Sequence, residues 1–203
     1  MKFKNIIFDL DGVLIDSKSN MNKSWSNTSR KYNLNIKFNK YEKFVGLPFR
    51  KILSELNIKK NLSDIEKYYA AQSLKNINKI KLYAYVKTIL KEINKKKINY
   101  AIVTSKDKKR SLKILKLFNL FPKSIHCPQK KQRGKPYPDQ INACMKMHKF
   151  KKKDTCYVGD MYVDYVASKR AGISFVYAGY GFGISSPNYK YKIKTFKDFR
   201  KFI

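Results

Sequence analysis

The order of apolar and polar residues along the chain predicts strands that alternate with helices. An apolar run at about 3–10 is typical of one buried strand and is far too short to span a membrane. Further short apolar runs predict strands at 99–104, 124–127, 155–158 and 173–177. Apolar residues at helical spacing predict helices at 83–97, 108–119, 138–147 and 164–171. This alternation predicts an α/β fold with a doubly wound, parallel, Rossmann-like sheet.

Residues 17–80 have a different pattern. They are polar and rich in Asn and Lys, with apolar residues at helical spacing and no convincing strand. Helices are expected around Trp25, at 38–45, at 50–56 and at 63–75, where Ser63 begins the last with a capping pattern. We therefore predict a core domain of residues 1–16 and 81–203 and an inserted small α-helical cap domain of residues 17–80.

The net charge of +32 in 203 residues has two interpretations. One is a surface that binds nucleic acid. The other is genome composition, because Lys, Asn, Ile and Tyr are abundant together whereas Arg, which suits phosphates and bases best, is scarce. We favour the second interpretation, that the charge reflects genome composition. No specific nucleic-acid partner is expected. Weak nonspecific binding of polyanions at low salt is expected, and the positive field would attract small anionic substrates.

The N-terminal segment and the cysteines bear on location. The first residues lead straight into the first predicted strand, so a cleavable signal is not expected. Cys127, Cys144 and Cys156 are unclustered in sequence and lack zinc-type spacing, which favours reduced, buried thiols. We expect a cytoplasmic protein with no membrane partner, as a monomer or dimer.

Two carboxylates stand at the end of the first predicted strand. Asp9 and Asp11 are two residues apart, so their side chains lie on the same side of the strand, and Gly12 begins a turn. The carboxyl ends of strands are where open α/β sheets place their active sites. Two acids repel each other and are costly to bury without a cation. A metal site that carries out a reaction is therefore the leading interpretation.

The other polar candidates also follow predicted strands or begin helices. They are Thr104, Ser105, Lys135, Asp160 and Asp164. If their strands are neighbours in a parallel sheet, these groups and the first two acids meet at one edge. Several carboxylates suit a hard cation such as Mg²⁺. With a hydroxyl and an ammonium beside them, they would make a complete site for phosphoryl transfer.

These residues resemble the motifs of the haloacid dehalogenase superfamily. The resemblance covers essentially the whole chain and is closest to the branch of phosphoglycolate phosphatase and β-phosphoglucomutase, which has a small helical cap. In chain order the four similar segments are 9–17, 103–106, 134–139 and 158–172. Each segment alone is a weak signal. Their shared order and separation make chance agreement very improbable.

The resemblance implies a role for each matching residue. Asp9 would attack phosphorus and form an aspartyl phosphate. Asp11 would protonate the leaving oxygen and later activate water. Thr104 and Lys135 would hold the phosphoryl oxygens, and Ser105 could add a backbone N–H.

The metal ligands implied by the resemblance are Asp9, the backbone carbonyl of Asp11, and Asp160. Asp164 would join the metal shell or orient Lys135. A helix N-terminal acid that interacts with the helix dipole is the alternative for Asp164.

The Asp9–Asp11 pair favours phosphate esters, because the resemblance implies that dehalogenases and phosphonate-cleaving relatives lack the second acid. The predicted function is therefore a Mg²⁺-dependent phosphatase of a small phosphorylated metabolite, such as a sugar, polyol, glycolate-type or amino-alcohol phosphate. The alternative is a sugar phosphomutase. The resemblance implies that mutases of this branch have a His in the hinge after the first motif, where this chain has Met21. A noncatalytic polyanion-binding protein is the less favoured third hypothesis.

The cap is expected to supply substrate recognition. Gly46 lies in a segment that resembles the cap loop of the family, and Arg50 either reaches over the site or only begins a surface helix. Lys106 is a candidate for binding a second anionic or hydroxyl group of the substrate. Met21 and Trp25 could line the pocket, although a core position suits Trp25 better.

Overall fold

A six-stranded sheet forms the centre of the computed structural model, which describes residues 2–130, 132–183 and 189–203. The strands are β1 (Asn5–Phe8), β4 (Asn99–Val103), β5 (Ile125–His126), β6 (Thr155–Gly159), β7 (Ser174–Ala178) and β8 (Tyr191–Ile193). Their order is β5-β4-β1-β6-β7-β8, and every neighbouring pair is parallel. The predicted α/β fold with a parallel sheet is confirmed. The central position of β1 places Asp9 between the ends of β4 and β6.

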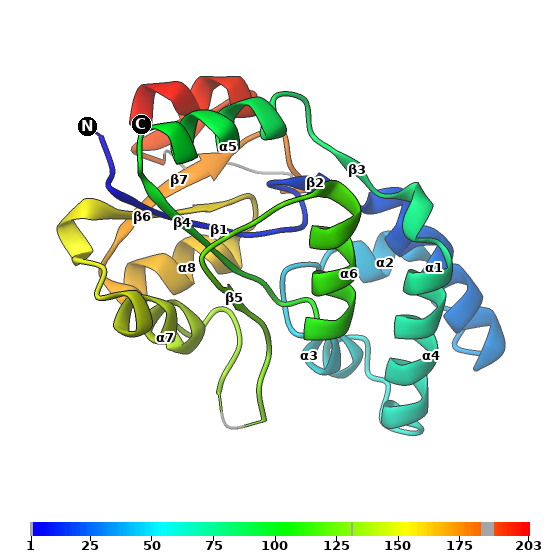
Figure 1. Ribbon diagram of the computed structural model, residues 1–203. Coiled ribbons are helices and arrows are strands. Elements are labelled where there is room, and N and C mark those ends of the chain that lie inside the picture. Colours follow the sequence, from blue (N-terminus) through cyan, green and yellow to red (C-terminus); the bar gives the residue numbers. More distant parts are fainter. Residues whose placement is uncertain (1, 131, 184–188) are drawn as a thin grey trace.

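Helices cover both faces of the sheet (Figure 1). The helices are α5 (Val86–Lys95), α6 (Lys108–Phe118), α7 (Asp139–His148), α8 (Tyr162–Ala171) and the 3₁₀ helices η2 (Lys152–Asp154) and η3 (Phe196–Phe202). One hydrophobic cluster joins the sheet to α5, α6 and η3, and a second joins it to α7 and α8. β1, β4 and β6 are therefore almost fully buried, which is why they read as continuous apolar runs.

A separate group of helices follows β1 in the sequence and lies beside the sheet (Figure 1). It contains α1 (Lys18–Lys31), α2 (Phe38–Glu42), α3 (Phe49–Glu55) and α4 (Leu62–Lys75), followed by the 3₁₀ helix η1 (Ile77–Lys79). These helices have a hydrophobic cluster of their own, in which Trp25 and Leu53 are completely buried. Trp25 Nε1 donates a hydrogen bond to the Ile36 carbonyl at 2.8 Å. Trp25 is therefore a core residue of this helical group.

The two connections between the sheet and the helical group run side by side. β2 (Ile15–Asp16) pairs antiparallel with β3 (Lys81–Leu82). Each strand has only two residues, so the hydrophobic pattern of the sequence could not reveal it. The pairing brings the entry and the exit of the helical group together.

Several element boundaries differ from those predicted. α5 begins at Val86 rather than at 83, because Tyr85 has a φ of 68°, which a helix interior does not accept. α4 begins one residue before Ser63, and α8 begins at Tyr162. β8 and η3 were not predicted, and they complete the sheet edge and one hydrophobic layer. No helix among the described residues is long and apolar enough to cross a membrane.

Candidate active site

Three buried carboxylates meet at the carboxyl edge of the sheet. Asp9 directly follows β1, Asp160 directly follows β6, and Asp164 lies in the first turn of α8. Each offers an oxygen that lies within 4.8 Å of the oxygens of the other two. Their exposed fractions are only 3%, 1% and 0%. The predicted convergence of these acids is therefore present in the structure.

Burial dominates the electrostatics of these acids. It raises the pKa of Asp9 to about 7, where Asp164 and Asp11 add to the increase and Lys135 opposes it. Burial also raises the pKa of Asp160 well above its usual range, and the neighbouring charges of Asp164 and Asp9 raise it further. Ionisation of all three acids therefore needs more positive charge than Lys135 offers, which favours a bound cation.

Lys135 is the cation that the structure places there. Its Nζ lies 2.7 Å from Asp164 Oδ1 and 3.0 Å from Asp9 Oδ1, and the side chain is nearly completely buried. Burial alone lowers the pKa of Lys135, but the Asp164 and Asp9 carboxylates raise it well above its usual value. Lys135 therefore stays charged, and it offsets only part of the negative charge around it.

Asp164 also has a structural role. Its Oδ2 accepts hydrogen bonds from the backbone N–H groups of Asp160, at 3.2 Å, and Met161, at 3.0 Å. The second contact caps the start of α8, as an acid in the first turn of a helix does. Asp164 thus fixes both Lys135 and the backbone that carries Asp160.

The arrangement fits a hard divalent cation. Asp160 Oδ1 and Asp9 Oδ1 are buried and accept no well-aligned hydrogen bond from any described residue, although Asp9 Oδ1 has the ion pair with Lys135. Asp160 Oδ2 accepts the Phe182 backbone N–H at 2.7 Å. Gly12 makes room for this carboxylate: its φ is +80°, and a Cβ there would lie 2.1 Å from Asp160 Oδ2. The buried Asp160 Oδ1, with no such partner among the described residues, and the neighbouring Asp9 carboxylate suit Mg²⁺ or a similar ion.

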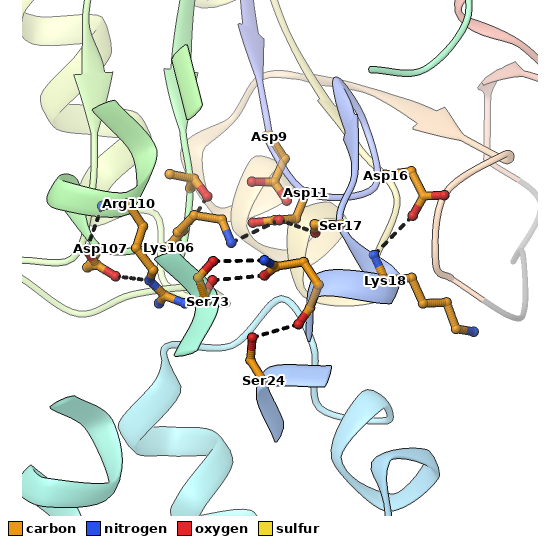
Figure 2. Close-up of polar contacts among 12 residues, drawn as sticks. Asp9, Asp11, Asp16, Ser17, Lys18, Ser24, Ser73, Lys106, Asp107 and Arg110 are labelled. Carbon is orange, nitrogen blue, oxygen red and sulfur yellow. Dashed lines mark hydrogen bonds and ion pairs between the residues drawn. The ribbon is translucent and has the colours of Figure 1, made fainter. Parts of the chain in front are cut away.

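Asp11 is held by two other side chains. The Ser17 hydroxyl donates a hydrogen bond to Asp11 Oδ1, and Lys106 Nζ lies 3.1 Å from the same oxygen. Figure 2 shows Asp11 beside Asp9, with Ser17 and Lys106 approaching it from different sides. Burial lowers the pKa of Lys106, and Asp11 opposes that decrease. The second acid is thus positioned separately from the carboxylate cluster.

A cavity opens over Asp9 and Asp11, between the sheet edge and the helical group. Residues from both parts line it, including Met21, Val45, Gly46, Thr104, Ser105 and Lys106. Ser105 Oγ donates a hydrogen bond of 2.6 Å to the Gly46 carbonyl, which joins the two sides. Thr104 is buried, and its Oγ1 accepts the Lys106 backbone N–H at 3.2 Å. The sequence-predicted residues Gly46, Thr104, Ser105 and Lys106 therefore surround one space.

Arg50 lies outside this cavity as the structure describes it. It stands in the first turn of α3, and its guanidinium donates hydrogen bonds to Glu66 at 2.7 Å and to Ser63 at 2.9 Å. About half of the side chain is exposed. The geometry matches the hypothesis that Arg50 begins a surface helix and does not show it reaching over the site, because α4 offers it acceptors on the outside.

Three further cavity residues escaped the sequence analysis. Arg110 on α6 is buried and has an ion pair to Asp107 (Figure 2). Its guanidinium carbon lies 5.2 Å from the ring centre of Tyr69. The hydroxyls of Tyr41 and Tyr69 are 3.0 Å apart. Burial raises the pKa of both phenols, so they stay protonated and can donate hydrogen bonds. The one available signal was that Arg110 is a lone arginine within a lysine-rich segment.

Comparisons with known proteins agree with this geometry. The profile of the family described as haloacid dehalogenase-like hydrolase matches residues 6–178. Pyrophosphatase PpaX of Oceanobacillus iheyensis is 26% identical over 175 residues, which cover 85% of this chain and 82% of that protein. Phosphoglycolate phosphatase of Haemophilus influenzae is 26% identical over 208 residues, which cover 92% of this chain and 90% of that protein.

A solved structure shows the same fold. It is the crystal structure of a predicted phosphatase from Clostridium acetobutylicum, with a TM-score of 0.86 at 22% identity. The likeness covers 99% of this chain and 98% of that chain. The arrangement of sheet and helical group is therefore shared along the full length of both chains.

Proposed function

The chain belongs to the haloacid dehalogenase-like hydrolase family, and from this premise we propose that it is a Mg²⁺-dependent phosphatase of a small phosphorylated molecule. The observation that carries the proposal is the buried group of Asp9, Asp160 and Asp164 around Lys135, with Asp11 next to it. We also propose that residues 17–80 form the cap domain over a core of 1–16 and 81–203. The separate hydrophobic cluster of α1–α4 supports that division.

The first chemical step would phosphorylate Asp9. A carboxylate oxygen of Asp9 attacks phosphorus, and the bond from phosphorus to the leaving oxygen breaks. Asp11 donates a proton to that oxygen, so the leaving group departs as a neutral hydroxyl. Lys135, at 3.0 Å from Asp9, and Thr104 would hold the other phosphoryl oxygens. Lys135 also offsets negative charge that would otherwise repel the anionic substrate.

The second step would release phosphate. Asp11, now ionised, takes a proton from a water molecule as the water oxygen attacks phosphorus. The bond between phosphorus and the Asp9 oxygen breaks, which restores the Asp9 carboxylate and leaves inorganic phosphate. Asp11 therefore ends the cycle protonated again. The hydrogen bond from Ser17 keeps its carboxyl group in one orientation for both steps.

Asp9, Asp160 and the backbone carbonyl of Asp11 are the groups that would hold Mg²⁺, with Asp164 beside them. The buried Asp160 Oδ1 and Asp9 Oδ1, which accept no well-aligned hydrogen bond from described residues, support this assignment. When bound, the ion would neutralise the phosphoryl and carboxylate charges that otherwise repel each other.

Hydrolysis suits the cavity better than phosphoryl transfer between two positions of a sugar. Met21 lines the cavity, at the place where the mutase pattern would have a histidine. The two histidines of the chain, His126 and His148, lie on β5 and at the end of α7. Neither belongs to the residues that line the cavity. The geometry therefore supports water rather than a second sugar hydroxyl as the acceptor.

We propose that the leaving group carries a second anionic group. Lys106 and Arg110 line the cavity as buried cations, and the hydroxyls of Tyr41 and Tyr69 lie on the cap side of the same space. Each cation has an ion pair, Lys106 with Asp11 and Arg110 with Asp107, and each also faces the cavity, where it could donate to a second anionic group. The relatives' names support the same class, because pyrophosphate has a second phosphoryl group and phosphoglycolate has a carboxylate.

The general test is phosphate release by the whole chain. Activity is expected with Mg²⁺ on a panel that includes pyrophosphate, phosphoglycolate and several sugar and polyol phosphates. Chelation of Mg²⁺ with EDTA is expected to abolish it. Absence of Mg²⁺-dependent release from every compound would contradict the proposed function.

Substitution of Arg110→Met is expected to raise KM for pyrophosphate or phosphoglycolate by about 10–100-fold, because a hydrogen bond to a charged group contributes about 1.5–3 kcal/mol. KM for a phosphate ester with an uncharged leaving group should change by less than about threefold by the same reasoning. Steady-state kinetics on both substrate types measure the difference. Methionine preserves most of the volume of the buried arginine stem.

The matched control is Arg50→Met, which removes an exposed arginine of α3 that is paired with Glu66 outside the cavity. It should leave KM for both substrate types near the wild-type value. An equal rise of KM for charged and uncharged leaving groups in Arg110→Met would contradict the assigned subsite.

The carboxylate cluster also predicts a stability effect. In EDTA, Asp160→Asn is expected to stabilise the fold by about 1–3 kcal/mol, because it removes a buried acid whose ionisation is opposed by burial and by the neighbouring Asp164 and Asp9. For a chain of this size that is a rise in Tm of about 2–4 °C per kcal/mol. Mg²⁺ should raise the Tm of the wild type and leave that of the variant unchanged.

Differential scanning calorimetry with and without Mg²⁺ measures both effects. Asp64→Asn, at an exposed position of α4, is the control and should retain the Mg²⁺ response. A lower Tm of Asp160→Asn in EDTA, or a full Mg²⁺ response in that variant, would show that the cluster is not arranged for a cation.

A further inference from the structure

A second group of metal-ligating side chains lies away from the cavity. His126, Cys144 and His148 each offer a nitrogen or sulfur atom, and these three atoms lie within 4.8 Å of one another. His126 and Cys144 are buried, and His148 is partly exposed. None of the three belongs to the carboxylate cluster or lines the cavity above it.

Local geometry brings these side chains together. Cys144 and His148 are four residues apart on α7, so they lie on one face of the helix. Ser124 directly precedes β5 and is two residues from His126, so their side chains lie on the same side, whereas Ile125 packs into the hydrophobic cluster of the opposite face. α7 packs against β4 and β5, which closes the group.

Ser124 occupies the middle of the group. Its Oγ lies 3.1 Å from His126 Nε2 and 2.7 Å from His148 Nε2, and it also hydrogen-bonds with Cys144. A hydroxyl has only one proton to donate, so it cannot satisfy both rings as a donor. The two ring nitrogens and the sulfur therefore converge on the Ser124 hydroxyl, which would have to turn aside for an ion to lie between them.

We propose that His126, Cys144 and His148 form a binding site for a transition-metal ion, with Zn²⁺ as the best-suited ion. Two imidazoles and one thiolate are ligands that Zn²⁺ prefers, and three protein ligands leave a fourth tetrahedral position for water or for the Ser124 hydroxyl. The carboxylate cluster has only oxygen ligands and suits Mg²⁺, so the two sites select different ions by ligand type.

The protonation states are compatible with this site. Burial lowers the pKa of His126 and of His148, so both rings are neutral near pH 7 and have a free nitrogen lone pair. Burial raises the pKa of the Cys144 thiol to about 12. Binding therefore requires Cys144 to lose its proton to solvent as the sulfur–zinc bond forms, with one proton released for each ion bound.

The position of the site connects it to the chemistry at the sheet edge. The segment that carries Lys135 begins after β5, which has His126, and ends at α7, which has Cys144 and His148. β5 is a two-residue strand at the edge of the sheet. An ion that joins β5 to α7 would fasten both ends of this segment. We therefore expect it to stabilise the fold without entering the reaction.

The test uses the full chain with excess Mg²⁺, so that the carboxylate cluster is filled before the probe ion is added. Titration with Zn²⁺ is expected to give one tightly bound ion, one released proton and a Tm higher by several degrees. Titration with Co²⁺ as the probe should give an intense thiolate-to-cobalt absorption band, which an oxygen-only site cannot produce.

Matched variants decide the assignment. Cys144→Ala should abolish the cobalt band, whereas Cys156→Ala, an equally buried cysteine on β6, should retain it. His148→Ala, at the partly exposed end of α7, should weaken Zn²⁺ binding by at least about tenfold. Because this position is partly exposed, the variant should fold even if the buried change Cys144→Ala does not. Absence of the band in the wild type, or its persistence in Cys144→Ala, would overturn the proposal, as would unchanged Zn²⁺ affinity in His148→Ala.

Discussion

Asp9→Asn is expected to lower kcat for phosphate release by at least about 10⁴-fold, because the amide cannot act as the nucleophile. The substitution preserves the size of a side chain that is almost completely buried. It also removes one of the acids that crowd Lys135, so the variant should fold. Phosphate release from the best substrate of the panel, measured with saturating Mg²⁺, gives the ratio.

Asp16→Asn is the control for this variant. Asp16 belongs to β2, and its carboxylate accepts the Lys18 backbone N–H outside the cavity. Its kcat should stay within about twofold of the wild type, the ordinary effect of a surface change. If Asp9→Asn kept a comparable kcat while folded, Asp9 would not be the nucleophile and another group would have to carry the reaction.

Asp11→Asn should divide substrates by their leaving group. For a phosphate ester of an aliphatic alcohol, loss of general acid and base catalysis is expected to lower kcat by about 10²–10⁴-fold. For p-nitrophenyl phosphate the first step needs little help from an acid, because nitrophenolate leaves readily without a proton. The second step still lacks its base, so phosphorylated Asp9 should accumulate.

Stopped-flow absorbance measures that accumulation as a burst of about one equivalent of nitrophenol, followed by a slow steady state. Ser17→Ala is the companion variant, since it removes only the hydrogen bond that orients Asp11. It should reduce kcat by less than about tenfold and give no burst. Absence of a burst with p-nitrophenyl phosphate in a folded Asp11→Asn variant would argue against the assigned acid and base role.

The carboxylate cluster could be predicted because its members have local signatures. Asp9 and Asp160 each end a strongly apolar strand, and the carboxyl ends of neighbouring parallel strands share one edge. Lys135 and Asp164 had no such support from hydrophobic pattern. They were candidates because they stand near the ends of predicted elements, and the family resemblance implied their roles. Only the structure shows the distances of 3.0 and 2.7 Å that join Lys135 to Asp9 and to Asp164.

Recognition groups could not be predicted in the same way. Arg110 and Tyr69 stand on helices 41 residues apart, and they meet only because α4 packs near α6. For the same reason Arg50 could not be placed: whether it faces the cavity or Glu66 depends on the path of α3 relative to α4. Position on a helix reveals which face is apolar, but it does not reveal what that face meets.

The amino-acid sequence by itself determined the order of strands and helices, the helical insertion and the acids at the strand ends. These features depend on periodicity within a few residues and on chain connectivity. The tertiary structure alone showed that Arg110, Tyr41 and Tyr69 also line the cavity. It also brought His126, Cys144 and His148 into one group, although the three cysteines gave no zinc-type spacing. The physical reason is that burial, pairing and desolvation depend on contacts between segments far apart in the chain, which local periodicity does not contain.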